Sequence, residues 1–577
     1  MNDLTSTQHC GDSLDLLLPA TTADGRARQA ARRVVDLNLS QTMRHVLYRS
    51  AGHLLVLGGE DEAVPAAREL NARLRCTVLI VGDKPESGRG QTEVLRTADD
   101  MTVMRGKLLE LTGHLGEFRA RVAMPDGEVN PARFSGAGQD HFDLVLDLTS
   151  PAFIQREILP PGYYAPGTDH AARQRALAEL PEMVGEFEKP KFFHYNPDIC
   201  AHGASGQKGC TRCLDACPTL AITSVGDKIT VDPHLCQGGG SCATACPTGA
   251  ITYAYPPVQE LHDAVRRVLK TYREAGGKHP GLLFHDHESG RQVVARIASR
   301  IPERIIPFEI EELGSVGMDA WLAALAYGAD RVVLFATPTV APSVIRELRA
   351  QLDYATAILE GMGYARERLQ LIPIDDETGV LEALNTKPQK AEFVAANFAA
   401  LSEKRTTLRL AVDHLYAQAP RAKQVIPLPT GAPFGEIRVN RAACTLCMAC
   451  VGVCPATALS DGADLPQLLF REWNCVQCGL CEIACPEDAI TRAPRFVFGP
   501  ELRQQTRILN EQQPFCCVVC GKPFATQAMM DRMTAKLKGH WMFQSPEALR
   551  RLQMCEDCRV KDMYARSGGL VDACRKL

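Results

Sequence analysis

The sequence predicts a multidomain protein of mixed α/β and α+β class, with two α/β domains, two small cysteine-rich modules and a C-terminal metal-binding domain. The length of 577 residues exceeds what one hydrophobic core organises. Of the 23 cysteines, all but Cys10, Cys76 and Cys574 cluster at 200–246, 444–485 and 516–558, and none lies between Cys246 and Cys444. The intervening stretches alternate between apolar and amphipathic segments, a pattern typical of α/β domains.

Composition shifts divide the chain into seven expected segments. The first 50 residues show no sustained apolar period, and Pro420, Pro427, Pro429 and Pro433 mark a linker before the later cysteines. The segments are an N-terminal extension (1–50), a Rossmann-like α/β domain (51–185), a first module (186–256), a second α/β domain (257–400), a linker (401–435), a second module (436–500) and a tail (501–577).

The first α/β domain is expected to begin with a βαβ unit. Residues 53–58 and 77–81 are apolar strands, residues 62–73 form a helix between them, and residues 142–148 add a further strand. The turn after the first strand contains Glu60, Asp61 and Glu62 and lacks the G-x-G-x-x-G pattern. These acidic groups would repel a pyrophosphate, so we expect no nucleotide site there.

The second module shows its cysteine pattern in complete form, C-x2-C-x2-C-x3-C-P, twice. Bacterial ferredoxins use this spacing to bind two [4Fe-4S] clusters, and the fourth cysteine of each run ligates the other cluster. Zinc does not require eight cysteines in two such runs, and a chain without a secretory signal keeps its thiols reduced. We therefore assign Cys444, Cys447, Cys450 and Cys485 to one cluster, and Cys475, Cys478, Cys481 and Cys454 to its neighbour.

The first run of the first module departs from this pattern. Cys210, Cys213 and Cys217 precede Pro218 with the expected spacing, but Gln207 stands where the first cysteine belongs. Cys200 lies upstream across a glycine-containing stretch that can fold it back as the missing ligand. The predicted ligands of this cluster are Cys200, Cys210, Cys213 and Cys246, and the alternative for Cys200 is an ordinary buried thiol.

The second run of the first module lacks its middle cysteine. Cys236, Cys242 and Cys246 precede Pro247, and Gly239 occupies the missing position. The corresponding cluster keeps only Cys236, Cys242 and Cys217. Three thiolates suit a [3Fe-4S] cluster, a [4Fe-4S] cluster with another ligand on its fourth iron, or an empty site, and the sequence does not choose among them. The chain is therefore predicted to carry three or four clusters.

The second α/β domain is expected to contain a parallel sheet. Residues 281–284, 304–308, 331–335 and 369–374 are strand-like, and residues 319–327 and 341–362 are helical. The phrases at 326–334 and 367–369 resemble the delta subunit of methyl-viologen-reducing hydrogenase. That family carries cysteines for a [2Fe-2S] cluster in this segment, and here they are missing. The resemblance implies a structural or docking domain without its cofactor.

The tail contains two C-x-x-C pairs, Cys517 with Cys520 and Cys555 with Cys558. Four thiolates suit tetrahedral zinc, and a redox dithiol is the alternative. Gly521 allows a tight turn around the metal, and the long spacing predicts a helix between the pairs. Cys516 and His540 compete with Cys517 as ligands.

Composition narrows the function. The net charge of −4 becomes more negative when clusters bind, which argues against nucleic acid as a partner. No apolar run approaches the ~20 residues of a membrane span. Without a secretory or twin-arginine signal, we expect a cytoplasmic protein. No P-loop, flavin fingerprint or Ser/His/Asp pattern indicates independent catalysis.

The phrases at 210–218 and 555–558 resemble a family of bacterial cytoplasmic multi-cluster ferredoxin-like proteins often associated with formate dehydrogenase. The resemblance implies an electron carrier for a cytoplasmic oxidoreductase, with formate dehydrogenase as its redox partner. The alternatives are a maturation or assembly factor for such an enzyme, and an enzyme that offers an open iron at the Gly239 site to a substrate. Potentials, donor and acceptor do not follow from the sequence.

Overall fold

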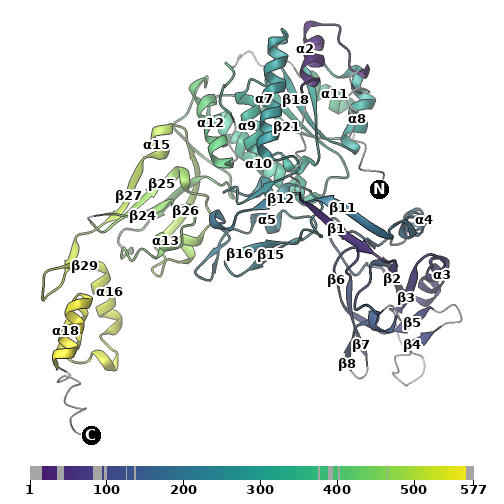
Figure 1. Ribbon diagram of the computed structural model, residues 1–577. Coiled ribbons are helices and arrows are strands. Elements are labelled where there is room, and N and C mark those ends of the chain that lie inside the picture. Colours follow the sequence, from purple (N-terminus) through teal and green to yellow (C-terminus); the bar gives the residue numbers. More distant parts are fainter. Residues whose placement is uncertain are drawn as a thin grey trace.

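The computed structural model of the protein describes residues 14, 16–35, 44–81, 94–96, 101–124, 127–135, 138–374, 377–386, 394–399, 403–463 and 465–566. The first α/β domain and the tail lie at opposite ends of the molecule (Figure 1). The two modules lie between them, below the second α/β domain (Figure 1). Among the described residues, no helix has the length and apolar character that a bilayer span requires.

The first α/β domain is built on a six-stranded sheet. Its elements are β2 (His53–Gly58), α3 (Glu60–Leu70), β3 (Arg75–Ile80), β4 (Val94–Arg96), β5 (Thr102–Arg105), β6 (Lys107–Thr112), β7 (Arg119–Met124), β8 (Gly127–Val129), β9 (Leu144–Asp147), β10 (Tyr163–Tyr164) and α4 (His170–Glu179). The strand order is β10-β9-β2-β3-β5-β4, and β2 runs parallel to β3 and β9. The predicted βαβ unit is present. Alanines of α3 pack on one face of this sheet, and β6 and β7 cover the other.

The expectation that the first 50 residues form an extension without packed elements is wrong for the described part. Helix α2 (Ala23–Arg32) packs against α7 (Val258–Glu274), and β1 (His45–Ser50) pairs with β11 (Gly185–Pro190). The helix buries Gly25, Ala27 and Ala31 together with Arg28, whose guanidinium donates to backbone carbonyls. Small and charged residues leave no apolar period for a sequence pattern to detect. Residues 1–13 and 36–43 lie outside the described part.

The second α/β domain contains the predicted parallel sheet. Its strands and helices are α7, β18 (Gly281–Asp286), α8 (Ser289–Ile297), β19 (Ile305–Ile310), α9 (Met318–Ala326), β20 (Arg331–Ala336), α10 (Pro342–Gly361), β21 (Leu369–Pro373) and α11 (Glu377–Asn385). The strand order is β19-β18-β20-β21, and every neighbouring pair is parallel. Parallel strands covered by helices are buried on both faces, which explains their continuous apolar runs.

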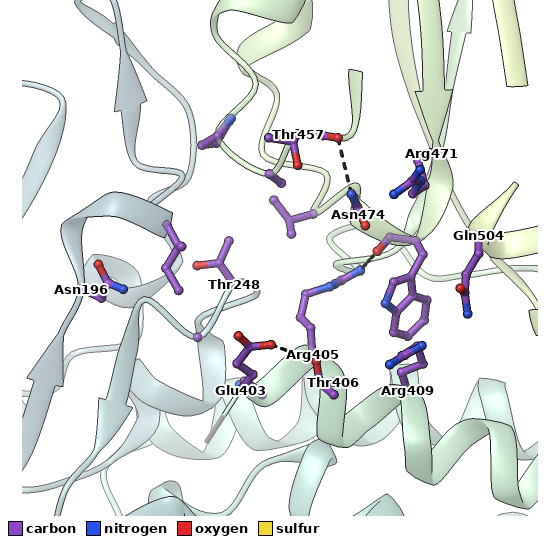
Figure 2. A pocket seen from close by; sticks show the side chains of 17 residues that line it. Asn196, Thr248, Glu403, Arg405, Thr406, Arg409, Thr457, Arg471, Asn474 and Gln504 are labelled. Carbon is purple, nitrogen blue, oxygen red and sulfur yellow. Dashed lines mark hydrogen bonds between the residues drawn. The ribbon is translucent and has the colours of Figure 1, made fainter. Parts of the chain in front are cut away.

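The linker expected at 401–435 contains a helix in the structure. Helix α12 (Lys404–Ala417) packs closely against α9 and buries Leu408, Ala411, Val412 and Leu415. The prolines all follow the C-terminal end of this helix, so they give no information about whether residues 404–417 are helical. The first turn of α12 reaches a cavity between the two modules (Figure 2).

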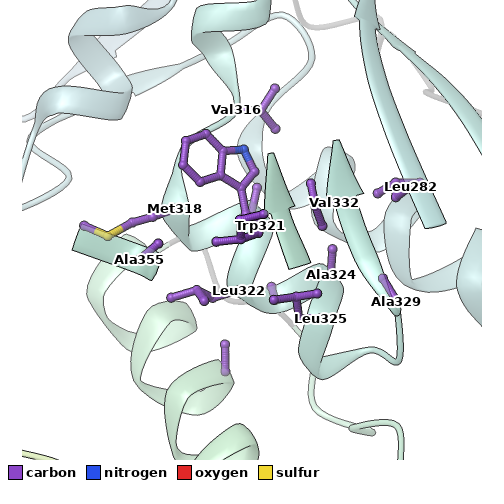
Figure 3. Close-up of a cluster of buried hydrophobic side chains, with 14 of the residues drawn as sticks. Leu282, Val316, Met318, Trp321, Leu322, Ala324, Leu325, Ala329, Val332 and Ala355 are labelled. Carbon is purple, nitrogen blue, oxygen red and sulfur yellow. The ribbon is translucent and has the colours of Figure 1, made fainter. Parts of the chain in front are cut away.

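The largest core of the molecule surrounds α9. Trp321 is fully buried there, with Leu322 and Leu325 on the same helix (Figure 3). Leu282 and Val332 reach this core from the parallel sheet. The same cluster includes residues of α2, α12 and the strands that lead into the second module. The second α/β domain is therefore a common base for segments that are far apart in the sequence.

The two modules share one plan of short strand pairs and single-turn helices. The first contains β12 (Phe193–Tyr195), β13 (Gly203–Ala204), β14 (Gln207–Lys208), α5 (Arg212–Asp215), β15 (Ile222–Val225), β16 (Lys228–Val231), α6 (Ser241–Ala245) and β17 (Ile251–Tyr253). The second contains β22 (Val425–Pro427), β23 (Gly435–Val439), α13 (Ala449–Gly452), β24 (Leu459–Asp461), β25 (Gln467–Arg471), α14 (Leu480–Ile483) and β26 (Ile490–Val497). Antiparallel pairing closes each module, with β12 paired to β17 in the first and both β22 and β23 paired to β26 in the second.

The tail continues directly from the second module. Its elements are α15 (Pro500–Gln504), β27 (Thr506–Glu511), β28 (Pro514–Cys516), β29 (Pro523–Thr526), α16 (Gln527–Leu537), α17 (Pro546–Leu552) and α18 (Glu556–Arg566). Strand β27 pairs with β25 of the module, so the two are joined by a sheet. The helix predicted between the two C-x-x-C pairs is confirmed, since α16 and α17 both lie there.

Candidate metal centres

The eight cysteines of the second module divide into two groups, and each group lines one cavity. The cavities have empty volumes of about 340 and 360 Å³. The first is lined by Cys444, Cys447, Cys450 and Cys485, and the second by Cys454, Cys475, Cys478 and Cys481. The fourth cysteine of each run has thus joined the first three of the other run. This is the grouping that crossed ligation requires, and ligation itself remains a prediction.

A third cavity of similar size, about 320 Å³, lies in the first module. Its cysteines are Cys200, Cys210, Cys213 and Cys246, the set proposed from the sequence. The hairpin of β13 and β14 brings Cys200 back, because the Cys210 N–H donates to the Ala201 carbonyl at 3.0 Å. The turn of the hairpin holds Gly206 at φ +77°. Chain folding therefore supplies a thiol at the place where the run has Gln207.

The remaining thiols of the first module, Cys217, Cys236 and Cys242, form a group of three. Burial raises the pKa of Cys242 well above its usual value, and the neighbouring Cys236 and Cys217 raise it further. Lys189 lies beside this group and donates to the carbonyls of His234 and Cys236 at 2.8 and 2.7 Å. Burial lowers the pKa of Lys189 to about 8, so it stays mainly cationic at pH 7. A cation at this position favours the negative charge of thiolate ligands.

The Gly239 position has room for the missing ligand. A β-carbon built there would meet only Pro218, whose Cγ lies at 3.5 Å, an ordinary contact distance. Its neighbours differ, because Gly238 and Gly240 have φ of +82° and +73° and press against Phe192 and Ser315. The backbone therefore does not require glycine at position 239. The effect of having no side chain there is that the three-thiol site lacks a fourth thiol.

We predict that Gly239→Cys completes the ligand set of the three-thiol site. If the native site is empty, iron per chain should rise by about four. If it holds three irons, iron should rise by about one and the oxidised [3Fe-4S] EPR signal should disappear. Gly239→Ala is the matched control, since it fills the same space without a thiol. Unchanged iron and EPR spectra in the cysteine variant would show either that the native site already holds four irons or that this position does not reach the site.

The four groups of thiols lie in one continuous series. Burial raises the pKa of Cys242, Cys210 and Cys481. In each case a cysteine of a neighbouring group is near enough to raise the pKa further. The two modules also touch directly, because a β-carbon on Gly209 would lie 2.6 Å from Cγ of the buried Leu480. The linking pairs are Cys242 with Cys213, Cys210 with Cys478, and Cys481 with Cys450.

The thiol groups fit iron–sulfur clusters. Burial raises the pKa of Cys450 to about 12, and the neighbouring Cys444, Cys447 and Cys485 contribute to the shift. Such thiols become thiolates only when a cation compensates their repulsion, so cluster binding would release protons. Apart from the cysteines, the cavity walls are mostly apolar or backbone, which suits a compact cofactor held by sulfur alone. A bound cluster supplies one-electron redox chemistry.

Several groups that contact the sulfurs were not predicted from the sequence. The Gln477 amide donates to Cys475 Sγ at 3.2 Å, and the Ala489 N–H donates to Cys485 Sγ at 3.3 Å. In the first module, the hydroxyls of Thr219 and Thr248 lie 3.4 and 3.5 Å from the sulfurs of Cys217 and Cys246. Hydrogen bonds to sulfur raise cluster potentials. The repeated Cys-Pro-Thr phrase could have revealed the threonines, whereas nothing in the sequence marked Gln477.

The two C-x-x-C pairs of the tail converge on one point. The sulfurs of Cys517, Cys520, Cys555 and Cys558 all lie within 4.8 Å of one another and could hold a metal ion. Gly521 adopts φ +73°, which confirms the expected tight turn. Desolvation acts to raise the pKa of Cys517, but N–H groups of Cys520, Cys555 and Val519 outweigh it and lower the pKa to about 6. Cys516 and His540 do not belong to the group.

A second polar group, His114 with Asp232 and His234, lies near Cys236 at the contact between the first α/β domain and the first module. The two imidazoles stack with centroids 4.4 Å apart and an angle of 11° between the rings. The lone pairs of two parallel stacked rings do not converge on one point, so this arrangement does not fit a metal ion. We interpret the pair as packing between the two domains.

Comparison with known families identifies the modules. A 4Fe-4S dicluster domain matches residues 207–250, and a second 4Fe-4S dicluster domain matches residues 436–490. A search of the curated proteins found no match to this chain. The first match begins after Cys200, so the assignment of this cysteine depends on the fold. The chain thus contains two ferredoxin-type 4Fe-4S domains, the class of domain that carries electrons in iron–sulfur proteins.

Proposed function

We propose that the protein carries electrons one at a time along a line of three or four iron–sulfur clusters, to or from an oxidoreductase of the cytoplasm. The observation that carries the proposal is the continuous series of four thiol groups across both modules. Two ferredoxin-type domains on a flexible chain would act as independent carriers. Here the close contact of Gly209 with Leu480 holds them together, so an electron can pass from one module to the other.

The two ends of the series differ in their surroundings. Cys447 is exposed, so the cluster at its end of the series lies near the surface beside the tail. At the opposite end Cys217, Cys236 and Cys242 are each partly buried, and Gly314 of the second α/β domain packs beside the Gly239 carbonyl. We place the docking of the redox partner at the Cys447 end. Formate dehydrogenase is the partner that the resemblance of the whole chain suggests.

The number of electrons that the protein takes up tests this proposal. Anaerobically purified protein should contain about 12 to 16 iron per chain and accept about three to four electrons in a dithionite titration, one for each cluster. The reduced protein should then give these electrons to a one-electron acceptor such as cytochrome c. A protein that contains zinc but about four iron or fewer would contradict the proposal.

The partner is tested separately. Catalytic amounts of a formate dehydrogenase together with formate should bleach the cluster absorbance of the oxidised protein. Full iron content without such bleaching would reject this partner and leave the carrier function standing. Transfer of iron from the protein to an iron-free partner would favour the alternative role in maturation.

A further inference from the structure

A cavity with about 910 Å³ of space for water-sized molecules lies between the two modules and the first turns of α12 (Figure 2). This volume is within the range of sites that bind small molecules and cofactors. None of the cysteines lines it, so it is separate from the cluster cavities. Its lining comes from parts of the chain more than 200 residues apart, which is why the sequence analysis did not find it.

The cavity borders two of the cluster sites, one in each module. Thr248 lines both this cavity and the one that contains Cys200 and Cys246. Pro455, Ala456 and Val476 line both this cavity and the one that contains Cys454 and Cys475. A bound molecule would therefore be separated from each of two clusters by a single layer of residues.

The wall of the cavity is basic. Lys404, Arg405, Arg409 and Arg471 line it, and Glu403 is the one acidic residue among the lining residues. Lys404 is held by the carbonyls of Ala243 and Thr244, at 2.8 and 2.7 Å. Arg405 donates to the Pro433 and Trp473 carbonyls and lies over the Trp473 ring, 5.0 Å from its centroid.

The other two cations remain available to a ligand. Among the described residues, neither Arg409 nor Arg471 has an ion-pair partner. In Figure 2, Arg409 extends from α12 and Arg471 from the second module. The first-turn N–H groups of a helix add partial positive charge, and Glu403 to Thr406 of α12 line the cavity. A guanidinium group is a strong hydrogen-bond donor to phosphate, so each of these cations can bind one.

We propose that this cavity binds a phosphate-bearing flavin of the flavin mononucleotide class. The inference rests on the proposed function, because it assumes that the two bordering sites hold clusters. Clusters exchange single electrons, whereas nicotinamides exchange hydride and therefore do not match them. Quinones accept single electrons but are neutral and apolar, so they leave the cations unused. A flavin accepts electrons singly and, as a mononucleotide, carries the phosphate that the basic wall requires.

The redox step balances with the groups at hand. Two electrons, one from each bordering cluster, and two protons from water at the mouth of the cavity reduce the flavin to its hydroquinone. Each cluster is left oxidised by one electron. The redox partner proposed above then reduces the two bordering clusters again, through the remaining clusters. The cavity would thus join a one-electron chain to a two-electron carrier.

The experiment is a titration of the full-length holoprotein with flavin mononucleotide under anaerobic conditions, followed by flavin fluorescence. We expect saturable binding of one flavin per chain. Riboflavin, which lacks the phosphate, should bind at least about tenfold more weakly. The double variant Arg409→Gln/Arg471→Gln should lose a similar factor for the mononucleotide but not for riboflavin. Arg366→Gln, an exposed arginine outside the cavity, is the matched control.

The outcomes separate this inference from the proposed function, because iron and EPR spectra are measured on the same samples. Full iron content without flavin binding overturns the flavin site and leaves the electron carrier standing. Equal affinities of the double variant and the wild type also overturn it, since the phosphate would then bind elsewhere. Low iron content contradicts the carrier function, and the affinity ratio still decides whether the basic cavity binds the phosphate.

Discussion

Replacing Cys200 with alanine should destabilise one [4Fe-4S] cluster and lower the iron content, by about four per chain if the cluster is lost and by about one if a [3Fe-4S] cluster remains. The residue lies outside the segment that matches a 4Fe-4S dicluster domain, at 207–250, and the run beginning at Gln207 has only three cysteines of its own. The structure places its thiol in the wall of the cavity that also holds Cys210, Cys213 and Cys246. Without it, this site would have three thiolates, as the Gly239 site already does.

The loss should also divide the electron path. This cluster site is the one through which the first module meets the second, since Cys210 is the cysteine close to Cys478. The three-thiol site would then be cut off from the second module. We expect dithionite to reduce the second module at an unchanged rate, while electrons leave the three-thiol site at least about tenfold more slowly. Rapid-freeze EPR after oxidation with a small oxidant would measure both rates.

Cys76→Ala is the control for this experiment. Cys76 is also a buried cysteine, and burial raises its pKa to about 12, but it lies in β3 of the first α/β domain. Its replacement should cost a few tenths to about 2 kcal/mol of stability and no iron. If Cys200→Ala likewise retained all of its iron and its EPR signals, Cys200 would be an ordinary buried thiol and the fourth ligand would lie elsewhere.

Replacing Cys520 with alanine should unfold the tail. The core of the tail consists of Cys517, Met554 and Cys555, with Phe524 and Cys558 packed against it, and this is too small to hold three helices in place. Structural zinc contributes about 10–16 kcal/mol of apparent binding energy in small domains of this kind, and that energy becomes folding energy. Loss of one of four ligands should therefore remove the metal and expose residues 513–566 to protease.

The design of this test uses a neighbouring cysteine. Cys520 and Cys516 are both exposed, so neither substitution leaves a cavity in the core. Cys516 is not part of the four-sulfur group, and Cys516→Ala should retain the metal and the protease resistance. Metal analysis would also show whether the ion is zinc, as the sequence predicts. Retention of metal by Cys520→Ala, or its loss from Cys516→Ala, would contradict the assignment.

Unfolding of the tail should also affect the neighbouring cluster site. The Thr526 hydroxyl donates to the Thr445 carbonyl at 2.8 Å, and Arg532 forms an ion pair with Glu487. Both partners lie beside cysteines of the site at the exposed end of the series, Cys444 and Cys485. The Cys520 variant should therefore lose this cluster faster in air than the Cys516 variant. These contacts give the tail a role in protecting the cluster site of the module that it follows in the chain.

Features that depend on a local pattern of residues could be predicted from the sequence. The cysteine spacing predicted the two groups of the second module, because a run of three close cysteines forms one wall of a cavity and a proline redirects the fourth. Continuous apolar runs predicted β2, β18, β20 and β21, because strands buried on both faces contain few polar residues. The two C-x-x-C pairs predicted the four-sulfur group of the tail for the same local reason.

Tertiary structure alone decided what depends on contacts between distant segments. Helix α2 buries only small residues and one arginine against α7, so its periodicity was too weak to reveal it. Helix α12 has apolar residues at 408, 411, 412 and 415, but its packing partner α9 lies about 90 residues earlier in the chain, so only folding shows where this face is buried. The β13–β14 hairpin decides that Cys200 reaches the cluster cavity, and the contact of Gly209 with Leu480 decides that the modules form one series. The basic cavity is likewise made of surfaces that meet only after folding. Close packing between such surfaces depends on their shapes, and a linear pattern of residue types does not encode those shapes locally.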